Sequence, residues 1–282
     1  MRLRDYNRSG AGSGDRAKGL GLKARIGGAA AVALALIAGG ATLAIKGRAA
    51  AVPTDATTLC PTKRPPSEIM VILLDVSDRF SEPQRLQIQN QLARVRDSIP
   101  RFGMVEVYTV DRLRRRVTEP VSHLCNPGTG ADLNKIYQNP QLAKKKWDGF
   151  AAKLRADIDH QIEKPAHQTS PIFEAIQASA LRTFGKPEYD GLPKRLVIVS
   201  DLLQHVPGGL SMYQGVPPFE SFKKTPYFSR VRSDLEGVSV LVFYLVRPGV
   251  AEQDRKHIAF WDSYFQAQGA DMEPVEKVFG DK

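Results

Sequence analysis

Segments typical of buried strands alternate along most of the chain with segments of helical periodicity. Runs dominated by apolar residues cover residues 69–74, 195–201 and 238–246, as expected for strands that are buried on both faces of a sheet. A further strand is predicted over residues 104–111, and a hairpin-connected edge strand within residues 116–128. The chain should therefore contain a sheet of at least these strands.

Apolar side chains at helical spacing predict helices between the strands. The first helix should begin at a capping box formed by Ser81 and Gln84 and end at Pro100. Further helices are expected over residues 141–164, after Pro171 and around Trp261. This order of elements implies an α/β fold with a doubly wound, mostly parallel sheet and helices on both faces.

A different apolar run lies near the N-terminus. Residues 26–45 carry no charge, and about 20 apolar residues are needed to span a hydrocarbon core of about 30 Å. Basic residues precede this run, which predicts a cytoplasmic N-terminus and a domain outside the cytoplasm. We expect a basic cytoplasmic tail (1–25), a transmembrane anchor (26–46), a linker (47–67) and a folded domain (68–282) in the periplasm or outside the cell. Small residues before Pro53 also fit a signal-peptide cleavage site.

Net charge and cysteine content narrow the class further. The chain has a formal net charge of +10, but residues 1–46 hold eight Lys or Arg and two Asp, which leaves only +4 for the remainder. This distribution argues against nucleic acid as a partner. Cys60 and Cys125 both follow the anchor, so we predict a disulfide between them, with two unrelated buried thiols as the alternative. Two distant cysteines supply too few ligands for a zinc site.

Asp75 directly follows the predicted strand over residues 69–74, and Asp201 ends the predicted strand over residues 195–201. Sites in doubly wound sheets form at the carboxyl ends of strands, near the point where the strand order reverses. The first strand commonly lies there beside the strand that follows the crossover, which would place the two aspartates side by side. Adjacent carboxylates repel each other, so they require a cation between them or a raised pKa.

The stretches "DVSDR", "TSPIFEAI" and "VIVSD" resemble the three signature stretches of von Willebrand factor A-type (VWA) domains. The resemblance covers roughly residues 68–269. It implies a metal-ion-dependent adhesion site in which Asp75, Ser77, Ser170 and Asp201 hold Mg²⁺ or another divalent cation. Ser170 stands where the family has a threonine.

One position departs from the family pattern, because Arg79 replaces the third hydroxyl of the first motif. A guanidinium repels a divalent cation, but it could itself neutralise Asp75 and Asp201. Three alternatives follow: a metal site built from the remaining oxygen ligands, a metal-free tip with Arg79 as a charge surrogate, or an inert tip with Arg79 in solvent.

The function that these features favour is that of a membrane-anchored, extracytoplasmic protein-binding module. The sequence contains no nucleophile elbow, zinc motif or Walker sequence, so we do not expect an enzyme. One alternative is a haloacid dehalogenase-like phosphatase with Asp75 as nucleophile, although Ser77 stands where that family has its second aspartate. The other is a structural envelope spacer. The partner protein is not identified by the sequence.

Overall fold

A sheet of seven strands lies at the centre of the computed structural model, which describes residues 37, 52–111, 119–131, 139–163 and 169–280. The strand order is β3-β2-β1-β4-β5-β6, and β7 also pairs with β5. The bounds are β1 (Ile69–Leu74), β2 (Met104–Thr109), β3 (Ser122–Cys125), β4 (Lys194–Ser200), β5 (Val238–Val246), β6 (Asp271–Met272) and β7 (Glu276–Phe279). Only β3 is antiparallel to its neighbour in this part of the chain.

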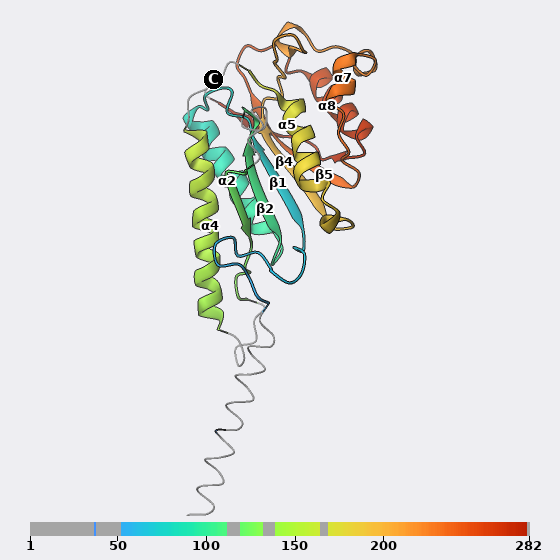
Figure 1. The fold of residues 1–282 in the computed structure, drawn as a ribbon. Coiled ribbons are helices and arrows are strands. Elements are labelled where there is room, and N and C mark those ends of the chain that lie inside the picture. The colour runs from blue at the N-terminus through green and yellow to red at the C-terminus, as the bar shows by residue number, and fades with distance from the viewer. Residues whose placement is uncertain (1–36, 38–51, 112–118, 132–138, 164–168, 281–282) are drawn as a thin grey trace, which may run out of the picture. The chain divides into compact units, whose positions relative to one another are not determined.

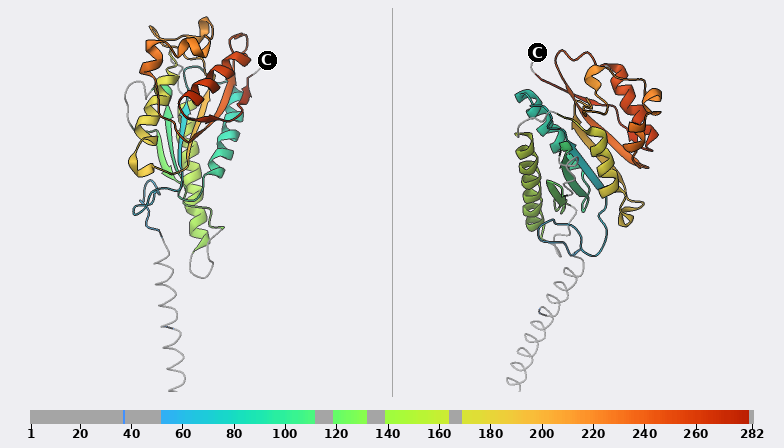
Figure 2. Two further views of the ribbon diagram at one scale, coloured as in Figure 1. Left: turned by 90° about the vertical axis from the view of Figure 1, so that its right-hand side faces the viewer. Right: turned by 45° about the horizontal axis from the view of Figure 1, so that its top comes forward.

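Helices cover both faces of the sheet (Figures 1 and 2). On one face lie α2 (Glu82–Ser98) and α4 (Pro140–Ile162), and on the other lie α5 (Ile172–Ser179) and α8 (Arg255–Ala267). Two short helices, α6 (Phe219–Phe222) and α7 (Pro226–Arg230), lie on the side of α8, and a π-helix, Ala180–Phe184, continues α5. The predicted fold class is therefore confirmed.

Local sequence explains why the main elements form where they do. All six side chains of β1 are buried, as a strand covered on both faces requires. The predicted capping box is present, since Ser81 accepts from the Gln84 amide and the Gln84 side chain accepts from the Ser81 amide. Asn139 caps α4 and Asp254 caps α8 in the same way, through side-chain oxygens that accept from the first turn.

The sheet divides the hydrophobic core into two layers. The layer under α5 and α8 is rich in aromatic residues and has Phe173 at its centre. The Phe173 ring stacks on Trp261 with centroids 4.6 Å apart and meets Tyr264 edge-on at 4.8 Å. The layer under α2 and α4 is mostly aliphatic, with Ile88 and Leu154 among its buried members.

The N-terminal segment, which we define as residues 52–67, is bound to the sheet edge. The Cys125 amide donates to the Thr58 carbonyl at 2.8 Å, and the predicted disulfide between Cys60 and Cys125 is confirmed, with Cα atoms 4.7 Å apart. Residues 52–67, most of the predicted linker, are thus held against the domain by these contacts.

The predicted basic tail, residues 1–25, lies outside the described residues, as does the predicted anchor, residues 26–46, apart from Ile37. Among the helices that the structure describes, none is both long enough and apolar enough to cross a bilayer.

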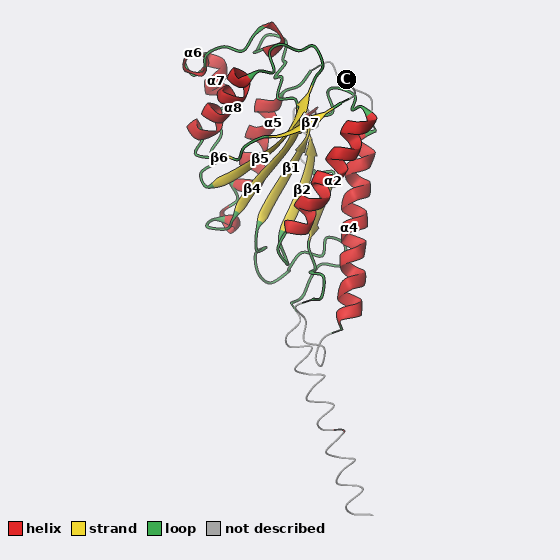
Figure 3. Ribbon diagram, turned by 180° about the vertical axis from the view of Figure 1, so that it is seen from behind, coloured by secondary structure: helices red, strands yellow, loops and turns green. Residues whose placement is uncertain are grey.

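Figure 3 shows two short strands that the sequence pattern did not predict, β6 and β7, which follow β5 along one side of the sheet. They have two and four residues, too few for a period to be recognised.

Candidate functional site

The carboxyl ends of β1 and β4 bring the two predicted aspartates together. The strands pair in parallel with Leu74 opposite Val199, and the Asp75 amide donates to the Val199 carbonyl at 2.9 Å. Asp75 and Asp201 are 2% and 1% exposed, so neither carboxyl group is hydrated to any extent. Their expected juxtaposition at the strand tips is confirmed.

Asp75 is held by a shell of hydrogen-bond donors. Its Oδ2 atom accepts from the hydroxyls of Ser170 at 2.8 Å and Ser200 at 2.7 Å, and its Oδ1 atom accepts from the Ser77 amide at 3.1 Å. Three donors offset much of the cost of burying a carboxylate. Of the predicted site residues, Ser77 and Ser170 are therefore both in contact with Asp75.

Asp201 is bound by an arginine that the sequence analysis did not include. Its Oδ1 atom accepts from the Leu203 amide at 2.9 Å, and its Oδ2 atom accepts from Arg247 Nε at 2.9 Å. The Arg247 side chain is only 16% exposed, so this ion pair lies largely out of water. A guanidinium from the residue that follows β5 thus lies where two adjacent carboxylates require positive charge.

Arg79, the charge surrogate predicted from the sequence, does not take this place. Its side chain is exposed, and its backbone carbonyl accepts from Arg247 Nη1 at 3.2 Å. Arg247 follows β5, which pairs with β4 in parallel register, so it emerges at the tip beside Asp201. The sequence signal was available, because "VSVLVFYLV" is a third buried strand and the residue directly after it is charged.

Further contacts fix the position of Arg247. Gln253 accepts from the Arg247 amide at 2.6 Å and donates to the carbonyls of Asp201 and Leu245. The guanidinium also forms an ion pair with Asp78, through Nη2 at 3.2 Å. Arg247 therefore links the β1, β4 and β5 tips.

Burial and the neighbouring Asp75 raise the pKa of Asp201 to about 6, although Arg247 and the Leu203 amide act in the opposite direction. In an unfolded chain this carboxyl would ionise near pH 3.8, so between these values the folded state binds the additional proton. The contribution of Asp201 to the free energy of unfolding is fully present below pH 3.8 and is lost as the pH rises through 6.

We therefore expect the wild type, compared with Asp201→Asn, to gain on the order of 3 kcal/mol between pH 7 and pH 4. Urea denaturation of both proteins across this range measures the difference. Taking the difference between the two proteins subtracts the titration of all other groups. If the free energies of unfolding of the wild type and Asp201→Asn changed in parallel with pH, the raised pKa of Asp201 would be contradicted.

A cleft of about 360 Å³ opens beside the aspartates. Hydroxyl, amide and imidazole side chains dominate its walls, and the lining residues are Ser77, Asp78, Thr169, Ser170, His205, Ser211, Tyr213 and Gln214. One wall is rigid, because Ser170 and His205 exchange two backbone hydrogen bonds of 2.9 Å. The surface at the tips is thus polar, preformed and accessible.

The residues at the tips do not fit a divalent cation as they stand. A guanidinium 2.9 Å from Asp201 repels a second positive charge at the position between the two aspartates. The described residues also contain no group of three or more His, Cys, Asp or Glu side chains that could hold a metal ion. A cation could enter only if Arg247 left Asp201.

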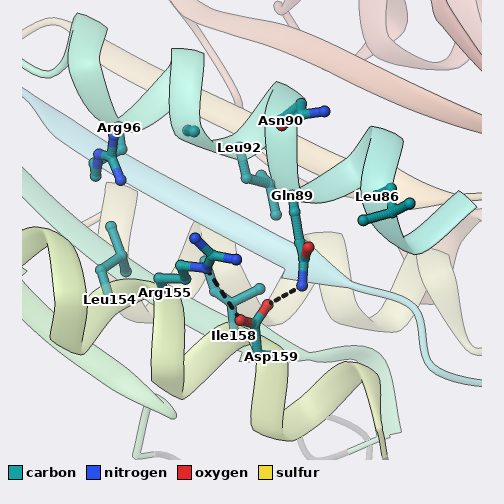
Figure 4. A pocket seen from close by; sticks show the side chains of 10 residues that line it. Leu86, Gln89, Asn90, Leu92, Arg96, Leu154, Arg155, Ile158 and Asp159 are labelled. Atoms are coloured by element: carbon teal, nitrogen blue, oxygen red, sulfur yellow. Dashed lines mark hydrogen bonds and ion pairs between the residues drawn. The ribbon is translucent and has the colours of Figure 1, made fainter.

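A second hollow, of about 210 Å³, lies between α2 and α4 (Figure 4). Asp159 on α4 accepts from Gln89 of α2 at 2.9 Å and pairs with Arg155 at 3.4 Å, and both contacts cross or flank the hollow. None of the predicted site residues lines it. The sequence-predicted chemistry is therefore confined to the strand tips.

Comparisons with known proteins were made by sequence and by structure. No family model matches this chain, and no curated protein matches it by sequence. Similar solved structures include the conserved hypothetical protein BatB from Bacteroides thetaiotaomicron, at 13% identity and a TM-score of 0.33, over 76% of this chain and 91% of that one.

Two others are the SpRpn10 VWA domain and an aerotolerance-related membrane protein from Bacteroides fragilis. The first has 11% identity and a TM-score of 0.36 over 76% of this chain and 89% of that one. The second has 15% identity and a TM-score of 0.31 over 74% and 90%. At these TM-scores the likeness carries no argument, and the resemblance to VWA domains is the one that the strand-tip stretches of the sequence suggest.

Proposed function

We propose that this protein is a membrane-anchored, extracytoplasmic binding module that docks a partner protein on its strand tips. The observation that carries this proposal is the cleft beside Asp75 and Asp201, whose hydroxyls and backbone groups are held in place before any partner arrives. Preorganised polar groups lose little conformational entropy on binding. In this proposal Arg247 supplies the positive charge, and Mg²⁺ binding is the alternative.

The geometry of Asp75 supports binding rather than phosphatase chemistry. A nucleophilic carboxylate needs a lone pair that can reach the substrate. Both oxygens of Asp75 accept hydrogen bonds, and the residue is 2% exposed. The role of this carboxylate in the proposal is to orient Ser77 and Ser170 at the cleft wall.

The direction of the chain also suits such a module. Residue 52 belongs to the segment that is bonded to Cys125, and Cys125 pairs with Met104 at the amino end of β2. The tips of β1 and β4 lie at the opposite end of the sheet. Residue 52 and the cleft therefore lie at opposite ends of the sheet within the folded domain.

The predicted topology is tested with an alkaline phosphatase reporter, which is active only outside the cytoplasm. A fusion at Lys282 should be active, and a fusion at Arg25, before the apolar run, should not. The physical reason is the basic cluster that precedes residue 26. The proposed orientation would be refuted if the alkaline phosphatase fusion at Lys282 were inactive while a reporter that works only in the cytoplasm were active at the same position.

Docking at the cleft is tested by site-specific photo-crosslinking in cells. A photoreactive phenylalanine analogue in place of Tyr213, which lines the cleft and is 44% exposed, should give one discrete protein adduct. The same analogue at Leu181, on the π-helix and 74% exposed, is the matched control and should give none.

A second substitution separates docking from chance proximity. Gln214 is exposed and lines the cleft, so Gln214→Arg should leave the fold intact while placing a bulky charge in the docking surface. The adduct yield should fall about tenfold, equivalent to about 1.4 kcal/mol. Equal adducts at Tyr213 and Leu181, or a yield that Gln214→Arg does not change, would exclude this face as the docking surface.

A further inference from the structure

A cluster of cysteine, histidine and glutamate lies at the end of the sheet opposite the cleft. His123 and Cys125 are two residues apart on β3, so their side chains share one face of the strand. Glu106 on β2 is the cross-strand partner of His123, and the disulfide adds Cys60 from the N-terminal segment. These four residues come from three separate parts of the chain.

Glu106 fixes the orientation of the His123 ring. His123 Nδ1 lies 2.9 Å from Glu106 Oε1, and His123 Nε2 lies 3.8 Å from the sulfur of Cys60. An ionised carboxylate can only accept, so Nδ1 must carry the proton of this hydrogen bond. In the neutral imidazole, Nε2 then presents its lone pair to the sulfur.

Glu106 is held in its ionised form although it is 4% exposed. Burial alone would raise the pKa of Glu106, but hydrogen bonds from His123, Thr183 and Tyr108 outweigh it and keep the pKa below its ordinary value. Thr183 donates at 2.7 Å and Tyr108 at 3.0 Å. Thr183 belongs to the π-helix, and such local widening of a helix often occurs at functional sites.

The two cysteine residues differ in burial. Cys125 is fully buried, whereas Cys60 is only partly buried, and the His123 side chain is 34% exposed. Of the two cysteines, Cys60 is therefore the one nearer to solvent and to an incoming thiol. An accessible cysteine beside a base, paired with a buried one, has the division of roles needed for thiol–disulfide exchange.

We infer that the Cys60–Cys125 disulfide is a thiol–disulfide exchange site, with Cys60 as the reactive sulfur, His123 as its base and Glu106 as the residue that positions His123. This role does not depend on the docking function of the strand tips. Its co-reactant is a low-molecular-weight thiol such as glutathione, or a protein dithiol.

The exchange proceeds in two balanced steps. The thiolate of the co-reactant attacks the Cys60 sulfur, the Cys60–Cys125 bond breaks, and Cys125 leaves as a thiolate that takes up a proton. A second thiolate attacks the co-reactant sulfur of the mixed disulfide and releases Cys60 as a thiolate, while His123 is protonated. The protein gains two electrons and two protons, and the co-reactant is oxidised to its disulfide.

Two acidic groups, Glu106 and Asp55, interact with His123. Glu106 bonds to its Nδ1 atom, and Asp55 of the N-terminal segment interacts with it electrostatically. The Arg182 guanidinium acts electrostatically on Tyr108, which donates to the same Glu106 carboxylate. A cationic neighbour stabilises a cysteine thiolate, so the proton that His123 takes up during the exchange stabilises the released Cys60 thiolate. The reduced state should therefore be favoured relative to that of an ordinary structural disulfide.

The first test measures thiol reactivity in full-length Cys125→Ser, which carries Cys60 as its single thiol. The rate of alkylation by iodoacetamide reports the thiolate fraction as a function of pH. We expect its midpoint to lie at least about one pH unit below that of a free thiol, near 8.5. Adding His123→Gln or Glu106→Gln to Cys125→Ser should move this midpoint back toward that of a free thiol. The control, His160→Gln, changes an exposed histidine on α4 and should leave the midpoint where it was.

The second test compares the wild type with His123→Gln, and both proteins keep the two cysteines. In glutathione buffers, His123→Gln should shift the equilibrium toward the disulfide about tenfold, which corresponds to about 30 mV for a two-electron couple. Circular dichroism should show that the reduced wild type stays folded. The inference is overturned if His123→Gln changes neither the alkylation midpoint nor the equilibrium with glutathione. It is also overturned if the wild type unfolds on reduction, because the disulfide would then be purely structural.

Discussion

Replacing Arg247 by methionine is expected to lower the free energy of unfolding at pH 7 by about 3–5 kcal/mol. The substitution removes the guanidinium that lies 2.9 Å from Asp201 and keeps most of the apolar stem. Asp201, 1% exposed and next to Asp75, would then be a buried charge without its cation. Urea denaturation at pH 7 measures the loss.

Matched variants separate this effect from general damage to the tip. Arg79→Met changes an exposed guanidinium on the loop after β1, whose backbone contacts Arg247, and should alter stability by less than about 0.5 kcal/mol. Adding Asp201→Asn to Arg247→Met should recover part of the loss, because the unpaired charge is gone. The loss should also shrink at pH 5, where Asp201 without Arg247 would be protonated. Equal losses for Arg79→Met and Arg247→Met would contradict the assignment of the cation to Arg247.

The same variant tests the alternative in which the tip binds a metal. With Arg247 removed, the oxygens of Asp75, Ser77, Ser170 and Asp201 meet no competing cation, so Mg²⁺ should raise the melting temperature of Arg247→Met by mass action. The wild type should not respond to Mg²⁺. If the wild type responds as strongly as the variant, then Mg²⁺ is the resident cation and Arg247 is not a substitute for it.

Removing the disulfide, in Cys60→Ser combined with Cys125→Ser, is expected to lower the free energy of unfolding by about 4 kcal/mol in the chain-entropy model. The two cysteines are 65 residues apart in sequence, so the cross-link restricts a long loop of the unfolded chain. It also fixes the N-terminal segment to β3, an edge strand of only four residues. Urea denaturation under non-reducing conditions measures the effect.

Chemical reduction provides the control for this prediction. Wild type in excess dithiothreitol should lose the same stability as the double serine variant, within about 0.5 kcal/mol, because both remove the same cross-link. A serine variant as stable as the oxidised wild type would mean that the hydrogen bond from Cys125 to Thr58 holds the segment by itself. The disulfide would then have no structural role, and exchange chemistry would be its remaining explanation.

The sequence alone determined the parts of this protein that depend on local pattern. Buried runs such as residues 69–74 could be placed because a strand covered on both faces has no polar side chains. The helix start at Ser81 could be placed because a capping box is formed by residues three apart. The placement of Asp75 and Asp201 at neighbouring strand tips followed from a general rule on strand order in doubly wound sheets.

The tertiary structure decided every feature that depends on register between distant segments. Arg247, rather than Arg79, reaches Asp201 because β5 pairs with β4 in a register that ends both strands at the same edge. Arg79 is nearer to Asp75 in sequence, but its side chain lies in solvent. Sequence proximity misled here because a charge is neutralised by whatever lies beside it in space.

The glutamate–histidine–sulfur cluster shows the same limit. Cys60 and Cys125 could be paired from their number and their predicted compartment, but the contact of His123 with Glu106 depends on the antiparallel register of β2 and β3. The hydroxyl of Thr183 reaches Glu106 from a π-helix that no local periodicity predicted. Residue types fix which chemistry is available, and only the folded chain decides which groups lie close enough to carry it out.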